Sequence, residues 1–351
     1  MKKIKIKITG HPITDTFGFS YFLLTLLKKY YDVELSEDPD YLFYHESFLD
    51  HYTYNCIKIF YTGENVSPDF NTCDYAISFD YLQFEDRHYR FPIYLMTTFF
   101  NQAELHAAGD NYLNKKYTFT QENLAEKKDF CSFVYSNYRA EIERKKMFNL
   151  LSTYKKVNSA GSYLNNTGGQ KIKNKLEYEK QHKFSVAFEN SSRSGYTTEK
   201  LVSSLVAQTI PIYWGNPNIA KEFNTRRFIN CHDYDSFEEV LDKVKELDTN
   251  DELYVKTLNE PLGVNDYNYD EVKAGLETFL RNIIDQPLLE AKRATINPVI
   301  ALSIKNNNML IERATKRKSI LLKIGATLYR PFKRSTFFEE LKHSYFSRKK
   351  N

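Results

Sequence analysis

One stretch of the sequence decides the fold: residues 183–215 read KFSVAFENSSRSGYTTEKLVSSLVAQTIPIYWG. Its beginning, Lys183–Phe188, and its end, Ile210–Trp214, are short apolar runs typical of buried strands. Between them, Glu199–Gln208 has apolar residues at helical spacing. A strand, a helix and a second strand in this order predict two parallel strands with a helix packed on their sheet.

The same alternation of strands and helices extends over most of the chain. We predict further strands at Ile4–Ile8, Ile57–Tyr61, Tyr75–Phe79 and Phe130–Tyr135, and further helices at Phe17–Tyr31, Arg139–Tyr154, Phe237–Leu247 and Asn268–Gln286. Two such series predict an α/β protein with two Rossmann-like lobes, separated by the polar stretch Gly109–Lys128. We expect an N-terminal lobe at residues 1–122 and a C-terminal lobe at 123–300, whose last helix could pack back on the first lobe. A basic helical tail would follow at 301–351.

The composition excludes several classes of protein. A length of 351 residues suits two domains, and 42% hydrophobic with 27% charged residues excludes disordered and fibrous chains. No run of about 18 apolar residues exists, and charge alternates with Ile in Met1–Thr9, which predicts a strand instead of a signal peptide. The four cysteines are widely spaced and favour neither a disulfide framework nor a zinc cluster. We therefore expect a cytoplasmic protein.

Positive charge is concentrated in the tail. Residues 301–351 hold 13 Lys and Arg against 3 Glu, a net of +10, so residues 1–300 carry −6 of the total of +4. Two segments, Ile320–Leu328 and Phe337–Tyr345, have apolar residues at helical spacing beside these cations. Amphipathic helices of this kind suit an anionic membrane surface, and we expect peripheral association with the inner membrane. A helix packed on the second lobe with a solvated cationic edge is the alternative.

The densest group of polar residues runs from Glu189 to Lys200, between the strand and the helix of the opening stretch. Ligands of α/β sheets bind at the carboxyl ends of strands, where this loop lies. The N-terminus of the following helix offers free N–H groups and a partial positive charge, which suit a phosphate, and Lys200 adds a full charge. Glu199 could accept hydrogen bonds from a ribose diol. With equal weight, Thr198 and Glu199 only start a helix, as an N-cap and an acidic first turn.

Three other candidates also have plain structural explanations. A guanidinium fork suits a diphosphate, but Arg144 lies on a charged helix face, and such faces are usually exposed. The turn after Trp214 either ends a core strand or forms a second wall of the ligand site. Glu64 follows the strand Ile57–Tyr61, where a partly desolvated carboxylate would suit a general base. Carboxylates in turns are more often solvated.

Two acidic pairs, Asp38-Pro39-Asp40 and Asp233-Tyr234-Asp235, have the D-x-D spacing that could hold a divalent metal with a nucleotide diphosphate. Both are short and common by chance, and the first has the composition of a turn. We assign a metal to neither pair. No P-loop, nucleophile elbow or G-x-G-x-x-G motif occurs in the sequence.

Three motifs follow one another in the opening stretch and its surroundings. They are Lys183-Phe-Ser-Val-Ala-Phe-Glu-Asn190, Tyr196-x-Thr198-Glu199-Lys200 and Ile210-Pro-Ile-Tyr-Trp-Gly215. Together they closely resemble the donor-binding signature of the α-1,3/4-fucosyltransferases. Tyr61-Thr-Gly-Glu-Asn65 resembles the N-terminal lobe of the bacterial members, and Phe133-Val-x-Ser136-Asn137 resembles the start of their second lobe. The resemblance extends from about residue 57 to residue 290.

The resemblance implies a GT-B fold, in which a cleft for donor and acceptor lies between two Rossmann-like lobes and the second lobe holds most of the GDP-fucose. At the matching positions, Glu64 would be the catalytic base, and Arg144 and Lys200 would be the cations on the donor diphosphate. The remaining matches to donor contacts are Asn190 and Tyr196, Glu199 at the ribose, Glu189 near the fucose and Tyr61 near the sugar.

The implied activity is that of an inverting α-1,3-fucosyltransferase, which moves L-fucose from GDP-fucose to a GlcNAc-containing acceptor (LacNAc or Lewis-type) of a surface glycan such as lipopolysaccharide. The reaction needs one base and positive charge on the departing GDP. We therefore expect no tightly bound cofactor and no required metal, although a divalent ion could stimulate turnover. Acceptor contacts are expected around Thr9–Thr16 and Leu82–Tyr94, where the resemblance says least.

Two alternatives stay open. The same lobes could use another nucleotide sugar or form an α-1,4 linkage. A non-enzymatic alternative is nucleic-acid binding through the basic, aromatic tail; the acidic body weighs against it, and we expect no nucleic-acid partner. We expect neither the N-terminal membrane anchor of animal relatives nor the seven-residue repeats of some bacterial ones.

Overall fold

The N-terminal part of the chain folds into a six-stranded sheet in which all pairings are parallel. Its strands, in the spatial order β2-β1-β3-β4-β5-β6, are β2 (Tyr31–Leu35), β1 (Lys2–Ile8), β3 (Tyr41–His45), β4 (Ile57–Tyr61), β5 (Tyr75–Ser78) and β6 (His88–Arg90). Strands β3, β4 and β5 are buried along their whole length, as expected for a parallel sheet covered on both faces. We call this sheet and its coverings the first lobe.

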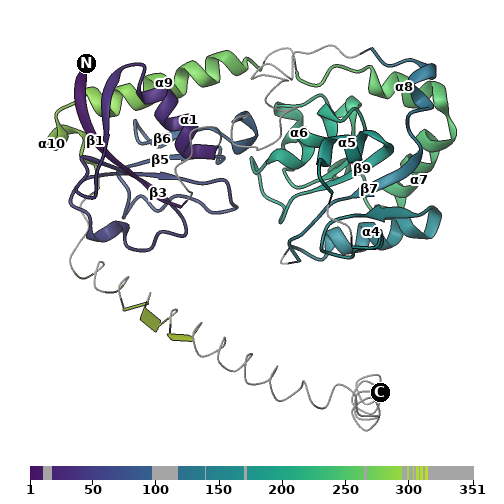
Figure 1. The fold of residues 1–351 in the computed structure, drawn as a ribbon, viewed down its shortest axis with the longest axis horizontal. Helices are drawn as coiled ribbons and strands as arrows, with labels where there is room; N and C mark the ends of the chain where they lie inside the picture. Colours follow the sequence, from purple (N-terminus) through teal and green to yellow (C-terminus); the bar gives the residue numbers. More distant parts are fainter. Residues whose placement is uncertain are drawn as a thin grey trace, which may run out of the picture. The chain divides into compact units, whose positions relative to one another are not determined.

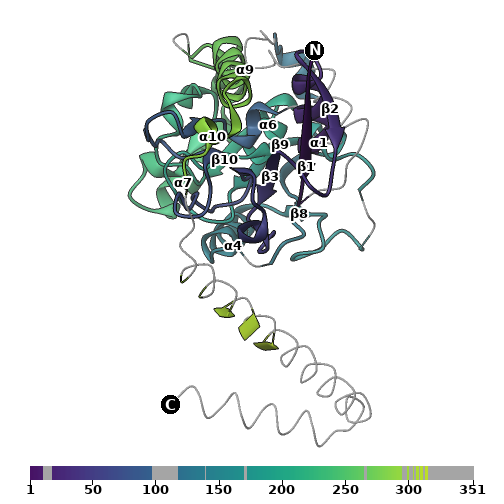
Figure 2. The same cartoon turned by 90° about the vertical axis from the view of Figure 1, so that its left-hand side faces the viewer.

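Two helices far apart in the sequence cover one face of this sheet (Figures 1 and 2). Helix α1 (Gly18–Leu27) follows β1 directly, whereas α9 (Tyr269–Asp285) comes almost at the end of the ordered elements. The α9 residues Leu276, Phe279, Leu280, Ile283 and Ile284 join the same core as the sheet residues Ile4, Ile6, Ile59 and Ile77. The short helix α10 (Leu288–Ala291) extends this covering.

The second sheet is also fully parallel, with the order β11-β10-β9-β7-β8. Its strands are β7 (Asp129–Phe133), β8 (Val157–Ser159), β9 (His182–Phe188), β10 (Ile210–Trp214) and β11 (Ile229–Asn230). The helices of this second lobe are α3 (Gln121–Leu124), α4 (Glu143–Tyr154), α5 (Lys175–Lys180), α6 (Glu199–Val206), α7 (Phe237–Thr249) and α8 (Asp251–Leu258). Short 3-10 turns complete the two lobes at His51–Thr53, Ile93–Leu95, Ile219–Lys221, Thr225–Arg227 and Cys231–Asp233.

A buried charge pair joins the two lobes. Glu222, which is 1% exposed, follows the turn after β10 and accepts a hydrogen bond of 2.7 Å from Arg90 at the end of β6. The hydroxyl groups of Tyr81 and Tyr94, also from the first lobe, donate to the same carboxylate. Because the Glu222 carboxylate is shielded from water and accepts from three first-lobe side chains, this junction holds the two lobes together.

The computed structural model describes residues 1–10, 18–96, 118–138, 140–169, 172–264 and 267–294, together with a few positions between 299 and 314. By its contacts the chain divides into two units, Met1–Thr295 and Ile296–Asn351. The tail segments Ile320–Leu328 and Phe337–Tyr345 lie outside the described residues. No helix in the described part of the chain is both long and apolar enough to cross a membrane.

The two-lobed α/β fold is confirmed, and the strands β4 and β10 have the predicted bounds. Two predicted helices were too long: α1 ends at Leu27, with Tyr31 already beginning the edge strand β2, and α4 begins at Glu143 instead of Arg139. Strand β3 (YLFYH) was not predicted, because a continuous aromatic run has no period that separates a strand from a helix. Asp38, Pro39 and Asp40 form the connection between these two missed strands.

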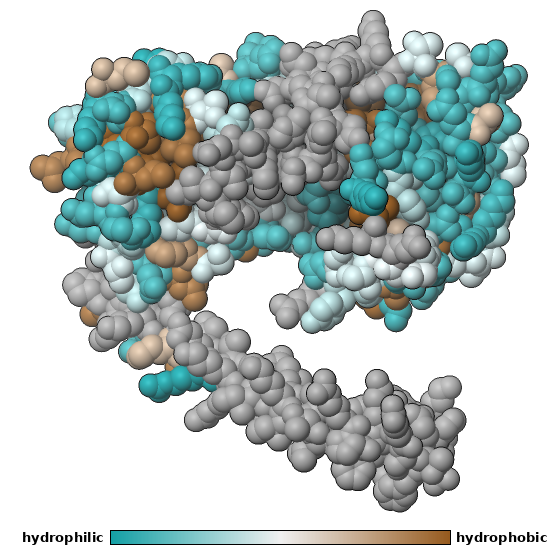
Figure 3. Space-filling view, viewed as in Figure 1, coloured by the Kyte–Doolittle hydropathy of each residue, from teal (hydrophilic) through white to brown (hydrophobic). Residues whose placement is uncertain are grey.

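The surface differs between the lobes in the view of Figure 3. Hydrophilic residues cover most of the second lobe, whereas apolar residues gather on the first lobe around α10. Leu288 and Leu289 of α10 are 44% and 89% exposed.

Candidate active site

The loop between β9 and α6 is organised by a buried carboxylate. Glu189 directly follows β9 and is fully buried. Its carboxylate accepts hydrogen bonds from the backbone N–H of Thr198 (2.7 Å) and from the Thr198 hydroxyl (2.8 Å). Thr198 is the N-cap residue of α6, as predicted, but its own side chain does not cap the helix. Glu189 instead holds the N-cap residue from across the loop, and its negative charge at this end of α6 complements the helix dipole.

Lys200 lies in the first turn of α6 and is surrounded by acceptors. Its Nζ is 3.1 Å from Glu189 Oε2, 3.4 Å from Glu199 Oε1 and 2.8 Å from Thr198 Oγ1. Burial alone would lower the pKa of Lys200, but the two neighbouring carboxylates outweigh it and raise this pKa well above its usual range. Burial likewise opposes the ionisation of Glu199, and Lys200 and Lys175 reverse this, so the pKa of Glu199 is lowered. Both groups are therefore charged at neutral pH.

Arg144 is buried, so the interpretation as a surface residue is wrong. It lies in the first turn of α4 and is 1% exposed. Its Nη2 donates to the backbone oxygen of Phe188 (2.9 Å) and to Asn190 Oδ1 (3.0 Å), and its guanidinium lies 4.0 Å above the Tyr135 ring. The buried Nε has no hydrogen-bond partner. The cation is thus fixed at the end of β9, with Asn190 oriented by it.

Tyr196 occupies the centre of the group. It is 1% exposed and packs against Phe79 of the first lobe, with ring centroids 5.1 Å apart. Burial raises the pKa of Tyr196, and the charges of Glu189, Lys200, Glu64 and Glu199 all act on its hydroxyl. The hydroxyl therefore lies where residues from both lobes meet.

The turn after β10 supports this loop. It therefore does more than end a core strand. Asn216 is fully buried, accepts from the Gly195 N–H (2.8 Å) and donates to the Thr197 hydroxyl (3.1 Å). Gly195 has a φ of +83°, and a Cβ there would lie 2.5 Å from the Phe79 oxygen. A Cβ at Gly215 would lie 2.4 Å from Cγ of Glu189. Both glycines are required by close approach of the chain.

Glu64 is the first-lobe residue that faces this group. It follows β4 in a turn where its N–H donates to the Thr62 hydroxyl (3.0 Å), which in turn donates to Glu46 (2.9 Å). The Glu64 side chain is open to solvent, yet the surrounding protein partly desolvates its carboxyl group and raises its pKa. Lys200 opposes this rise, and Glu46 adds to it. The next residue, Asn65, donates a hydrogen bond to Ser191, so the turn of this first-lobe carboxylate lies against the second-lobe loop that leads to Lys200.

Tyr61 ends β4, three residues before Glu64, and its side chain is buried. It is 4% exposed, its ring stacks on Phe19 at a centroid distance of 3.6 Å, and its hydroxyl donates to the backbone oxygen of Thr9. The structure thus brings together Glu64, Arg144, Glu189, Asn190, Tyr196, Glu199 and Lys200, and places Tyr61 in the core at the end of β4.

Sequence reasoning missed several residues that build the site. Tyr135 carries Arg144 and accepts from the Phe188 N–H (2.7 Å), and Asn216 braces the loop. Arg193 binds Asp80, a residue 113 positions away in the chain. Only the Gly-Asn-Pro turn was a signal for Asn216, and no sequence signal pairs Arg193 with Asp80.

The D-x-D pairs do not join the site. Asp40 accepts from the Lys5 N–H (3.0 Å) and Asp233 from Asn230 (2.8 Å). Among the described residues, no group of three or more His, Cys, Asp or Glu could hold a metal ion.

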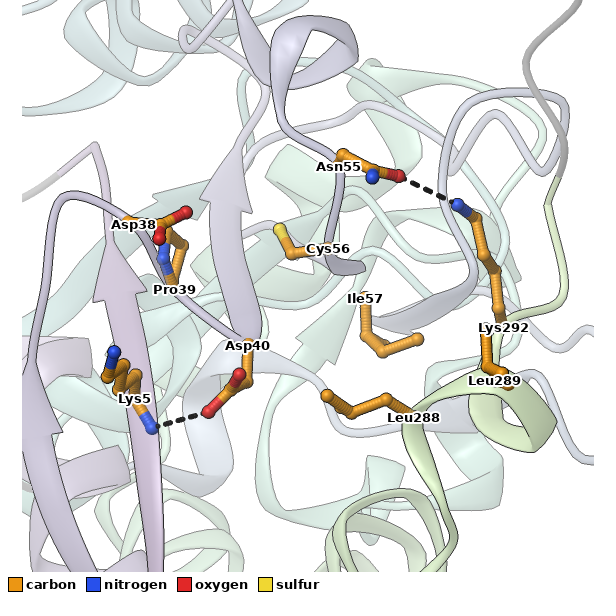
Figure 4. A pocket seen from close by; sticks show the side chains of 10 residues that line it. All are labelled: Lys5, Asp38, Pro39, Asp40, Asn55, Cys56, Ile57, Leu288, Leu289 and Lys292. Atoms are coloured by element: carbon orange, nitrogen blue, oxygen red, sulfur yellow. Dashed lines mark hydrogen bonds between the residues drawn. The ribbon is translucent and has the colours of Figure 1, made fainter.

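A separate cavity of about 370 Å³ lies at the opposite end of the first sheet (Figure 4). Its lining includes Asp38, Asp40, Ile57 and Lys292. Because Ile57 begins β4 and Glu64 follows the end of the same strand, this cavity is remote from the site described above.

Two parallel α/β lobes, with the cations Arg144 and Lys200 on one and the carboxylate of Glu64 on the other, have the arrangement of a glycosyltransferase of the GT-B class. The profile of the "Alpha-(1,3)-fucosyltransferase FucT N-terminal domain" matches residues 5–97, and that of "Glycosyltransferase family 10 (fucosyltransferase) C-term" matches residues 124–259. The chain belongs to this family of fucosyltransferases, which confirms the resemblance inferred from the motifs.

Individual relatives agree with this family. "Alpha-(1,3)-fucosyltransferase FucT" of Helicobacter pylori is 36% identical over 259 residues, which cover 65% of this chain and 54% of that protein. "Putative fucosyltransferase R654" of Acanthamoeba polyphaga mimivirus is 35% identical over 162 residues, or 43% of this chain and 27% of that protein. The chain therefore spans about half or less of the length of these curated relatives.

Solved structures show the same fold. A crystal structure of an α1,3-fucosyltransferase with GDP-fucose superposes with a TM-score of 0.62 at 32% identity, covering 82% of this chain and 93% of that chain. A second structure, of an α1,3-fucosyltransferase with GDP, gives a TM-score of 0.64 at 30% identity and covers 85% and 93% of the two chains.

Proposed function

We propose that the protein is an inverting α-1,3-fucosyltransferase, which transfers L-fucose from GDP-fucose to a GlcNAc-containing acceptor of the LacNAc or Lewis type on a surface glycan. One observation carries the proposal: Asn65, the residue after Glu64, donates a hydrogen bond to Ser191 in the loop between β9 and α6, which we call the donor loop, so Glu64 lies beside the loop that leads to Lys200. A base and a cation for the leaving group are thus held at one site.

Glu64 acts as the general base. It takes the proton from the acceptor hydroxyl as that oxygen attacks the anomeric carbon of fucose, and the bond from this carbon to the β-phosphate oxygen breaks. GDP leaves with the bonding electrons. A single displacement inverts the anomeric configuration, so β-linked GDP-fucose gives an α-fucoside.

Arg144, Lys200 and the N-terminus of α6 stabilise the charge that develops on GDP. These groups are fixed before the donor binds, because Arg144 is held by Phe188 and Asn190 and Lys200 by Glu189. Fixed cations in a partly buried site need no reorganisation during the reaction. Glu199 and Asn190, both half-buried on the same loop, contact the ribose and phosphates.

The direct test is a transfer assay read by mass spectrometry. The protein is incubated with GDP-fucose or GDP-mannose and with lactose, LacNAc or a type 1 chain. We expect a mass gain of one deoxyhexose on LacNAc with GDP-fucose alone, and NMR of the product should show an α-1,3 linkage. Transfer from GDP-mannose would instead favour the alternative donor, and an α-1,4 product would change the regiochemistry.

We also propose that the tail, residues 301–351, attaches the protein peripherally to the anionic inner membrane. Its net charge of +10 supports this location. The full chain should co-sediment with vesicles that contain an anionic lipid and should not do so with neutral vesicles. A chain ending near residue 310 should lose this binding and keep transfer activity; binding by that shorter chain, or tail-dependent binding to RNA in place of vesicles, would contradict the proposal.

A further inference from the structure

We propose that Arg193 is a positioning residue, which fixes the loop that carries Glu64 against the donor loop. This inference rests on the proposed function, because it concerns the placement of the base for sugar transfer. Arg193 itself lies in the donor loop between β9 and α6 and matches none of the residues assigned to donor contacts.

The Arg193 guanidinium binds three first-lobe residues. Nη2 is 2.7 Å from Asp80 Oδ1 and also donates to the Ser67 hydroxyl, while Nη1 donates to Asn65 Oδ1 at 3.2 Å. The guanidinium lies 5.1 Å above the Phe79 ring. A planar fork with several donors is required for this set of partners, and a lysine could not bind them together.

Each partner lies directly beside the candidate base or the sheet edge that supports it. Asn65 follows Glu64 in the chain, and its other amide atom, Nδ2, donates to Ser191 of the donor loop. Asp80 follows the end of β5 and accepts from Ser67 (3.1 Å) and Ser78 (3.2 Å). The segment 64–67 is therefore held on one side by its own sheet and on the other by Arg193 and Ser191.

The backbone of Arg193 in the donor loop is also held in place by hydrogen bonds. The Arg193 N–H donates to the Gly215 oxygen (3.2 Å), and the Arg193 oxygen accepts from the Tyr196 N–H (3.1 Å). Arg193 thus connects the turn that holds Glu189 and Tyr196 with the turn that holds Glu64. Because the side chain is 35% exposed, its ion pair contributes little to the stability of folding. Its effect should appear instead in the geometry of the reacting groups.

The test compares Arg193→Met with a matched control, Arg226→Met. Arg226 also forms an exposed ion pair, with Glu260 at 3.2 Å, but within the second lobe and away from the site. Misplacement of a reacting group by about 1 Å costs roughly 100-fold in rate. We therefore expect Arg193→Met to lower kcat by about 10- to 100-fold while the KM for GDP-fucose changes less than about twofold. Arg226→Met should leave both constants unchanged.

Two further measurements separate positioning from a general structural role. Hydrogen exchange should become faster in residues 62–67 of Arg193→Met, in the presence of GDP, and stay unchanged in α7. The acidic limb of the kcat/KM profile should move to lower pH, because a released Glu64 gains water and its carboxyl group becomes more acidic. The charges that face Glu64, namely Lys200, Glu46, Glu199 and His45, are the same in both proteins.

A second variant guards against an effect of the methionine itself. Asp80→Ala removes the main partner of Arg193, and the double variant should lose no more kcat than Arg193→Met alone, because both changes break one connection. Unchanged kcat and exchange in Arg193→Met would overturn the inference, and so would an equal loss of GDP affinity, which would mean that Arg193 binds the donor directly. If the unaltered protein transfers no fucose, the proposed function fails, and the exchange of residues 62–67 alone then decides whether Arg193 holds this loop.

Discussion

The two lobes contribute to the site in opposite ways. On the second lobe, Glu189, Arg144 and Tyr196 are at most 1% exposed; Arg144 donates to the end of β9, and Glu189 accepts from Thr198. On the first lobe, Glu64 is exposed and is held through its backbone and its neighbours. The second lobe therefore presents fixed charge to an anionic ligand, whereas the first lobe presents one reactive carboxylate whose position depends on a loop.

The largest effect, a loss of kcat, is expected from substitution of the exposed carboxylate Glu64 on the first lobe. Glu64→Gln keeps the shape of the side chain but removes the base, so kcat should fall by about 10²–10⁴-fold. Affinity for GDP, measured by calorimetry, should stay within about twofold, because the cations on the second lobe are untouched. If GDP affinity fell as much as kcat, both lobes would bind the nucleotide. The division between a nucleotide-binding second lobe and a first lobe that supplies the base would then be wrong.

The second largest effect is expected from loss of the buried ion pair between Lys200 and Glu189 on the second lobe. Lys200→Met leaves the carboxylate of Glu189 buried without its cation, and removal of one partner of a buried pair destabilises a protein by about 3–5 kcal/mol. We expect a loss of about 3 kcal/mol in urea unfolding, together with weaker GDP binding. The double variant Glu189→Gln with Lys200→Met has no stranded charge and should regain part of the stability. Full additivity of the two single changes would contradict a direct pair.

A smaller effect is expected at the point where the lobes touch. Gly195→Ala forces a side chain into a φ of +83° and places its Cβ 2.5 Å from the Phe79 oxygen. A left-handed conformation alone costs about 1–2 kcal/mol, so thermal unfolding should occur at lower temperature, and kcat should fall as the loop shifts. Gly168→Ala is the matched control, since that glycine has a φ of +81° with open space around it. Equal kcat in the two variants would show that contact with Phe79 does not matter.

The smallest effect concerns pH. The pKa of Glu64 is raised in the folded protein, so its protonated form is favoured by folding. This group contributes stability below its unfolded pKa and loses that contribution as pH rises through the folded pKa. Glu64→Gln should therefore unfold at a slightly higher temperature than the unaltered protein at pH 7, and the difference should vanish near pH 4. A variant that is less stable at pH 7 would show that Glu64 is held by favourable contacts instead.

The sequence predicts the second lobe far better than the first. The stretch around Glu189 and Lys200 is local, since the strand, loop and helix that place these residues are consecutive, and their patterns are visible without long-range information. The burial of Arg144 could not be predicted from the local sequence, because a charged helix pattern indicates exposure. This burial depends on contacts with Tyr135 and with the end of β9. The partners of Arg193 and Glu222 come from distant segments and have no local signal.

The sequence predicts α9 as a helix, but only the tertiary structure shows which sheet this helix packs on. Its apolar stripe fits either sheet, and the packing of Leu280 and Ile284 in the first-lobe core shows to which sheet it belongs. The hydrogen bonds of Tyr31 with Asp285 and of Tyr75 with Ala291 hold the end of this region on the same lobe. Strand β3 was missed because it is buried along its whole length and shows no alternation, whereas β2 was missed because the predicted helix extended to its first residue, Tyr31.

The late position of α9 has a consequence for synthesis. The apolar face of the first sheet is formed by residues near the N-terminus, but Leu280, Ile283 and Ile284 that cover it are translated after the whole second lobe. Nascent chains usually fold from the N-terminus onward. Here about 285 residues must leave the ribosome before that face is covered. The second lobe therefore completes its core first. The uncovered first sheet is the part of the nascent chain that a chaperone would need to shield.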